Sequence, residues 1–258
     1  MLNSMVERIG RMAGAPLVAI GFLTVLPLPL PTALAMGPMG WPVAAFPLAG
    51  AGIGALLALL NLALGPWVPG GLLVALLLAA LMAITGALHL DGLMDTFDGL
   101  FGGKAPEGRV AIMRDSRVGS FGVAAAITML LVEYSALQSL PLQQRTGPLI
   151  AALCLSRWAM AVTIWLFPPA SNRGLAAGLK PAIRWWHVAT ATLLAVAITA
   201  WSLGVGSLAV LVAPVATLLL LGWLALRRIG GITGDICGAV GELSEVSTLV
   251  VGTILAGL

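Results

Sequence analysis

Charged residues are scarce in this chain. Only 9% of its 258 residues are Asp, Glu, Lys or Arg, and 60% are hydrophobic. A soluble globular protein carries about 25% charged residues, so this shortage excludes a water-soluble domain and predicts a polytopic membrane protein. The net charge of +3 is small and gives no indication of a nucleic-acid partner. The expected surrounding is the lipid bilayer.

Cysteine is also nearly absent. Cys154 and Cys237 stand among apolar or small residues and form no CxxC spacing. Buried thiols in such surroundings usually behave as small hydrophobic groups. We therefore expect two unpaired structural thiols.

Long apolar runs are abundant, and a bilayer span needs roughly 17–25 such residues. Seven runs fit this length, at about residues 43–64, 71–88, 119–140, 147–167, 187–204, 208–226 and 240–258. The segment from Ala15 to Leu30 is apolar too, but its prolines favour a re-entrant or interfacial piece over a straight span. The predicted fold is an all-α polytopic integral membrane protein with about seven transmembrane helices and a single catalytic domain over residues 1–258.

The basic residues orient these spans. With seven spans and a cytoplasmic N-terminus, the inner loops hold eleven Lys and Arg residues and the outer loops hold only Arg145. This asymmetry follows the positive-inside rule and predicts a multi-pass protein of the bacterial inner membrane. Loops 89–118, 168–187 and 227–242 then surround one cytoplasmic mouth of the bundle, where we expect the active site.

Four of the five aspartates fall within two neighbouring stretches, HLDGLMDTFDGLFGG and RVAIMRDSRVGSFG. Asp91, Asp95 and Asp98 are spaced i, i+4 and i+7, so they share one face of a helix that continues beyond span 71–88. Like charges this close repel, and carboxylate oxygens are the ligands that Mg²⁺ prefers. We expect Asp91, Asp95 and Asp98 to be catalytic and, together with Asp115, to bind Mg²⁺.

Basic side chains follow these acids and are predicted to bind substrate, together with the hydroxyl of Ser116: Lys104, Arg109, Arg114 and Arg117. Carboxylates for a metal ion and guanidinium groups for phosphate oxygens are the two halves of a phosphoryl-transfer site. The alternative is a solvated helix end whose acids only form ion pairs with the arginines.

The roles of five further polar residues stay open. Asp235 and Glu242 lie on a second glycine-rich turn, where a metal or nucleotide contact and a capped helix start are both open. Arg157 and Glu133 lie within predicted spans, and an ionised group in hydrocarbon needs a partner. An ion pair between helices and, for Arg157, a substrate contact are both open. His89 is either an interfacial ring or a substrate-binding group.

The two aspartate-containing stretches, together with the later GGITGDICGAVGE, resemble the cobalamin synthase family (adenosylcobinamide-GDP ribazoletransferase). The early FLTVLPLP and FPLAGAGIG segments are similar to that family as well, so the resemblance runs from about residue 20 to 245. It implies an integral membrane enzyme of cobalamin nucleotide-loop assembly. Such an enzyme uses Mg²⁺ to join adenosylcobinamide-GDP to α-ribazole or its 5′-phosphate, and it releases GMP.

The resemblance also implies which residues form the site. The family's acidic motif falls on Asp91, Asp95 and Asp98. Its basic block falls on Arg109, Arg114, Asp115, Ser116 and Arg117, and its C-terminal block on Gly234, Asp235 and Glu242. The chain departs from the family near residue 171, where Ser-Asn-Arg replaces an aromatic–Ala–Arg–acid lead. A substrate role for Arg173 is therefore left open.

Three other functions compete with this one. A CDP-alcohol phosphotransferase also uses clustered aspartates, but its signature expects Ala-Arg soon after the second Asp-Gly, where this chain has Leu100-Phe101-Gly102-Gly103. An aspartate-rich prenyltransferase would need a second Asp-rich helix. An ion-coupled transporter would carry its acids near the bilayer midplane. The oligomeric state stays open, with a homo-oligomer among the possibilities.

Overall fold

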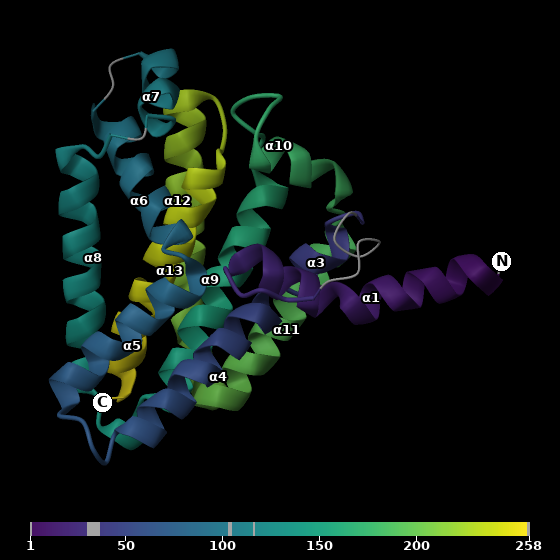
Figure 1. The fold of residues 1–258 in the computed structure, drawn as a ribbon. Helices are drawn as coiled ribbons and strands as arrows, with labels where there is room; N and C mark the ends of the chain where they lie inside the picture. The colour runs from purple at the N-terminus through teal and green to yellow at the C-terminus, as the bar shows by residue number, and fades with distance from the viewer. Residues whose placement is uncertain (1, 30–36, 103–104, 116, 257–258) are drawn as a thin grey trace.

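The computed structural model describes residues 2–29, 37–102, 105–115 and 117–256, which form a helical bundle (Figure 1). Its helices are α1 Leu2–Leu23, α3 Gly40–Ala44, α4 Phe46–Leu64, α5 Gly70–Thr85, α6 Leu88–Phe97, α7 Pro106–Met113, α8 Ser120–Ser139, α9 Thr146–Leu166, α10 Leu175–Leu179, α11 Trp185–Leu203, α12 Val212–Ile229 and α13 Gly234–Ala256. A π-helical turn, Asp98–Gly102, follows α6 directly. Apart from one isolated bridge between Pro169 and Ile232, no β-structure occurs in these ranges.

Within the described residues, six unbroken segments are long and apolar enough to cross a membrane: Phe46–Leu64, Ser120–Ser139, Leu142–Leu166, Trp185–Leu203, Leu208–Ile229 and Gly234–Leu255. A seventh crossing is possible if α5 and the following Leu88–Gly102 form one bent span. These segments coincide with the runs expected from hydropathy. The prediction of an all-α polytopic membrane protein with about seven spans is confirmed.

The seventh span departs from its prediction, because α5 ends at Thr85 and the aspartates lie on a separate helix, α6, that begins at Leu88. Gly86 ends α5 with φ 62°, its N–H reaching the carbonyl of Met82, and Ala87 follows with φ 54°. Two successive left-handed residues break the helix and turn the chain, and this conformation is costly for alanine because its Cβ crowds the backbone. Segment Leu88–Gly102 is consequently bent by 91° from α5.

α9 lies at the centre of the bundle, where nearly every one of its side chains is buried, and α4, α11 and α13 pack around it. Glycine permits the closest of these contacts. A Cβ atom at Gly50 of α4 would lie 2.1 Å from the carbonyl oxygen of Leu153 in α9, and one at Gly54 would lie 2.5 Å from that of Leu149. Small residues that let helix backbones touch are typical of membrane bundles.

The N-terminal helix behaves differently from the others. Figure 1 shows α1 extending sideways out of the bundle. Its apolar part, Met12–Leu23, is too short to count as a span, and the helix ends before the prolines at 27 and 29. This agrees with an interfacial or re-entrant segment.

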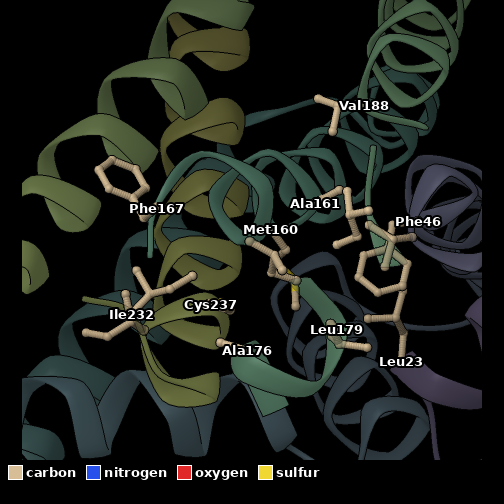
Figure 2. Close-up of a cluster of buried hydrophobic side chains, with 14 of the residues drawn as sticks. Leu23, Phe46, Met160, Ala161, Phe167, Ala176, Leu179, Val188, Ile232 and Cys237 are labelled. Atoms are coloured by element: carbon tan, nitrogen blue, oxygen red, sulfur yellow. The ribbon is translucent and has the colours of Figure 1, made fainter. Parts of the chain in front are cut away.

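One buried hydrophobic cluster is formed by residues from distant parts of the chain (Figure 2). Leu23 of α1 and Phe46 of α4 meet Met160 of α9 and Leu179 of α10, and the cluster continues to Ile232 in the turn before α13. This core fixes the short α10 and the α12–α13 turn against α9, and these are the segments that shape the functional site.

Candidate functional site at the α6–α13 crossing

α6 and α13 touch backbone to backbone through two glycines. A Cβ atom at Gly92 would lie 3.0 Å from the carbonyl oxygen of Asp235, and one at Gly238 would lie 3.3 Å from that of His89. The sequence favours this contact because Gly92 and Gly238 leave no side chain between the helices. The crossing brings Asp91 and Asp95 of α6 to the first turn of α13, which carries Asp235.

The acidic groups at this crossing are close enough to act on one another. The carboxyl of Asp95 is repelled by those of Asp91, Asp235 and Asp98. Asp235 is repelled by Asp91 and attracted by the guanidinium of Arg114, and its Oδ2 accepts a 3.2 Å hydrogen bond from the Thr233 hydroxyl. The structure thus gathers Asp91, Asp95 and Asp235 into one negatively charged group, from segments 140 residues apart.

Asp98 has a different environment from its two neighbours in the motif. It begins the π-helical turn, is only 8% exposed, and points at the start of α8. Its Oδ2 accepts the N–H of Gly119 at 2.8 Å and its Oδ1 accepts that of Gly122 at 2.9 Å. A carboxylate that accepts free amides at a helix N-terminus stabilises that helix. The expected common face of three aspartates is therefore divided, with Asp98 holding α8.

Replacing Asp98 with Ala is expected to lower the free energy of unfolding by about 1–3 kcal/mol, because two buried N–H groups lose a charged acceptor. The loss would appear as a lower melting temperature in detergent micelles. Asp91→Ala is the matched comparison, since Asp91 is exposed. Equal melting temperatures for the Asp98→Ala variant and the unsubstituted protein would contradict the capping role.

The predicted metal ligands do not form a complete coordination shell. Among the residues that the structure describes, no three acidic, His or Cys side chains are placed to hold a metal ion alone. Asp115 instead pairs with Arg117, whose Nη2 lies 2.6 Å from its Oδ2 and lowers the pKa of the exposed carboxyl to about 2. Mg²⁺ usually takes one or two carboxylates and completes its shell with water and substrate phosphates. Asp91, Asp95 and Asp235 can supply one or two such carboxylates, but not a complete set of ligands.

A cavity of about 210 Å³ adjoins this acidic group. Arg114 at the end of α7, Arg173 before α10, and Thr233 and Asp235 at the start of α13 all line it. Guanidinium groups are well suited to phosphate oxygens, so the cavity joins cationic and acidic groups as a phosphoryl-transfer site requires.

The other predicted basic residues have separate positions. Arg109 donates a hydrogen bond to the carbonyl of Leu100, as does Arg228 from α12, so both side chains hold the π-helical turn. Arg117 is highly exposed and engaged with Asp115. Lys104 and Ser116 lie outside the described residues.

Arg157 is inside the bundle. It is 1% exposed, donates a 3.2 Å hydrogen bond to Oε2 of Glu245 in α13, and also donates to Ser156. Of the two roles left open by the sequence, the structure shows the ion pair between helices. The partner is Glu245, and Glu133 of α8 lies beside that glutamate.

His89 is buried, and Glu242 is half-buried. His89 is 2% exposed, and neither ring nitrogen has a hydrogen-bond partner. Glu242 follows Asp235 by seven residues, about 10 Å further along the helix axis, where it shares a cavity of about 10 Å³ with Glu133. The structure does not bring these two side chains to the 210 Å³ cavity that Arg114 and Asp235 line.

Sequence reasoning did not anticipate Thr233 and left Arg173 open. The signal for Thr233 is its position two residues before Asp235, since a threonine before a helix often caps it. Its Oγ1 indeed accepts the N–H of Ile236. No local signal marks Arg173, because its proximity to Arg114 depends on how α10 packs against α9 and α13.

A family model described as cobalamin-5-phosphate synthase matches residues 15–253. The chain belongs to this family. The resemblance expected from the motifs is therefore confirmed, and it covers slightly more of the chain than the motifs alone indicate.

Curated relatives match most of the length of this cobalamin-5-phosphate synthase family member. An adenosylcobinamide-GDP ribazoletransferase of Desulforamulus reducens is 41% identical over 70% of this chain and 72% of its own. One of Desulfitobacterium hafniense is 35% identical over 90% and 94% of the two chains, and one of a Sinorhizobium species is 38% identical over 90% and 92%. No solved structure matches the chain.

Proposed function

We propose that this protein joins adenosylcobinamide-GDP to α-ribazole, or to α-ribazole 5′-phosphate, and releases GMP. The observation that carries the proposal is the α6–α13 crossing, where three aspartates meet Arg114 beside a cavity. The names of the relatives supply the substrates. The positive-inside distribution of basic residues supports a cytoplasmic location for this end of the bundle, at the inner membrane of a bacterium.

Three carboxylates and two guanidinium groups would bind the diphosphate, the carboxylates through Mg²⁺ and the guanidinium groups directly. Carboxylates from Asp91, Asp95 and Asp235 would share the Mg²⁺ shell with water and substrate phosphate, and the bound ion would neutralise charge on the phosphate oxygens. Arg114 and Arg173 line the cavity together with Asp235 and would bind further phosphate oxygens. The acidic group would bind a cation and the basic group an anion, and a Mg²⁺-bound diphosphate supplies both.

The chemical step is the displacement of GMP. A ribose hydroxyl oxygen of α-ribazole attacks the phosphorus that bears the aminopropanol arm of the corrinoid. A new P–O bond forms, the P–O bond to GMP breaks, and its electron pair leaves with the GMP phosphate. The hydroxyl proton passes to a carboxylate of the cluster or to water. Arginines that bind the leaving phosphate favour this step by stabilising its charge.

Purified protein in liposomes is expected to form one GMP per corrinoid consumed when it receives Mg²⁺, adenosylcobinamide-GDP and α-ribazole. EDTA should stop the reaction, and added Mg²⁺ should restore it. Absence of GMP would overturn the proposed reaction, and GMP formation that persists in EDTA would remove the metal from it. Ion flux into the same liposomes without GMP release would favour a transporter, and CMP release from a CDP-alcohol would favour the related phosphotransferase.

A further inference from the structure

Thr233 stands directly before α13 and contacts the acidic group through its side chain. Its hydroxyl donates a 3.2 Å hydrogen bond to Oδ2 of Asp235 and accepts the backbone N–H of Ile236, also at 3.2 Å. A hydroxyl has one hydrogen to donate and lone pairs that accept, so both bonds can form together. Thr233 therefore caps α13 and holds the Asp235 carboxylate at the same time.

The backbone on the N-terminal side of Thr233 is fixed as well. Ile232 donates its N–H to the carbonyl of Pro168, and its own carbonyl accepts the N–H of Ala170, both at 2.9 Å. Gly231 permits this approach, because a Cβ atom there would lie 2.7 Å from the Ala170 nitrogen. The Ile232 side chain is buried in the hydrophobic cluster of Figure 2. Thr233 thus follows a turn that is held by both backbone and side-chain contacts.

The same backbone contact joins the acidic and basic parts of the site. Pro169 and Ala170 lead along the chain to Arg173, and all three residues line the 210 Å³ cavity together with Thr233 and Asp235. The two hydrogen bonds of Ile232 therefore fix the turn before Asp235 relative to the segment that carries Arg173.

The Asp235 carboxylate keeps room for a cation in spite of its bonds. A carboxylate has about four lone-pair positions. The Thr233 hydroxyl takes one, and the backbone N–H of Asp235 itself takes another. Repulsion from Asp91 acts to push this carboxylate away from the cluster. A neutral hydroxyl can oppose that movement without bringing a positive charge that would compete with the cation.

We propose that Thr233 is a positioning residue for the metal site, and that its hydroxyl orients the Asp235 carboxylate so that Asp235 and Asp91 can share one divalent cation. This inference rests on the proposed function for the presence of Mg²⁺. Side chains that orient a metal ligand typically change metal affinity about 10- to 100-fold. Thr233 and Asp235 are both half-buried, so we expect an effect near the lower limit.

The test is the binding of Mn²⁺, which suits the same oxygen ligands as Mg²⁺ and whose free ion is counted by its EPR signal. The whole chain in nanodiscs of zwitterionic lipid is titrated with and without adenosylcobinamide-GDP. Thr233→Val keeps the shape and removes the hydroxyl, and it should weaken Mn²⁺ binding about 10-fold. Thr233→Ser keeps the hydroxyl and should bind Mn²⁺ nearly as well as the unsubstituted protein. Thr128→Val, which removes an exposed hydroxyl on α8, is the matched control.

A double-variant cycle separates positioning from capping. If Thr233 acts through Asp235, Thr233→Val should weaken Mn²⁺ binding no further in a protein that carries Asp235→Asn. The lost cap, by contrast, should lower the melting temperature in both backgrounds. The positioning role is overturned by an unchanged Mn²⁺ affinity in Thr233→Val, by an equal loss in Thr233→Ser, or by additive effects in the cycle.

GMP release distinguishes failure of this inference from failure of the proposed function. If Mn²⁺ binds with these sensitivities but the unsubstituted protein releases no GMP, the proposed reaction fails and the positioning role stands. If that protein releases GMP but binds no Mn²⁺ with or without the corrinoid substrate, the reaction stands and the positioning role is overturned.

Discussion

Replacing Asp95 with Asn is expected to reduce turnover by about 10²–10³-fold, the range seen when one charge-stabilising group is removed from an active site. Asp95 lies amid the carboxyls of Asp91, Asp98 and Asp235, so it contributes centrally to the charge that would attract Mg²⁺. The asparagine has nearly the same shape, which leaves the fold intact. GMP release in liposomes at saturating substrate measures the effect.

Asp95→Asn should also affect the melting temperature, and without Mg²⁺ it should not lower it. Without Mg²⁺, Asp95→Asn removes repulsion between like charges, so the melting temperature should stay unchanged or rise. With Mg²⁺, the unsubstituted protein should gain stability through binding, and the variant should gain less. Thr128→Val on the exposed face of α8 serves as control. Full turnover by Asp95→Asn, or an undiminished Mg²⁺-induced shift in melting temperature, would remove Asp95 from the site.

Hydropathy and the distribution of charge were sufficient to predict the membrane architecture. Crossing a bilayer requires apolar runs of limited length, and this requirement leaves few alternatives for a chain with 9% charged residues. Six predicted runs correspond to unbroken helices. The exception is the α5–α6 bend, where Ala87 adopts a left-handed conformation that alanine rarely takes. No local pattern signals such a residue, because its cost is offset by tertiary contacts.

Local sequence patterns predicted part of the candidate site, and the rest depends on tertiary packing. The spacing of Asp91 and Asp95 predicted their shared helix, and the pattern of acids followed by arginines predicted the type of chemistry. The spacing did not reveal that the Asp98 carboxylate also accepts the backbone amides at the start of α8. Asp235 joins the cluster only through the Gly92–Gly238 contact, which depends on the packing of two distant segments.

The sequence predicted an ion pair as one of two open roles for Arg157, since an arginine in hydrocarbon needs a partner. It did not predict that Glu245 is this partner. Three glutamates, at 133, 242 and 245, stand on helices that flank Arg157. The distance of each glutamate from Arg157 in the sequence does not indicate which one pairs with it. The rotation of α13 about its axis determines the partner. That rotation is set by Gly241, whose carbonyl accepts the Ser156 hydroxyl at 2.7 Å, and it directs Glu245 at the guanidinium.

Replacing Arg157 with Met is therefore expected to lower the free energy of unfolding by about 3–5 kcal/mol, because Glu245 becomes a buried charge without a cation. The methionine fills a similar volume, so lost packing contributes little. The measurement is reversible unfolding in mixed micelles, compared with Lys180→Met, which removes a cation that caps the carbonyl end of α9 near the surface and should cost less.

The double variant Arg157→Met/Glu245→Gln decides whether the loss comes from the unpaired charge. Removing both charges should recover most of the stability, since a pair of neutral groups carries no uncompensated ion into the membrane. Glu245→Gln alone should also destabilise the protein, because it leaves the guanidinium buried against weaker acceptors at Ser156. Strictly additive effects of the two single substitutions would show that the pair is not coupled, and the account of α9 and α13 held together by this contact would then be wrong.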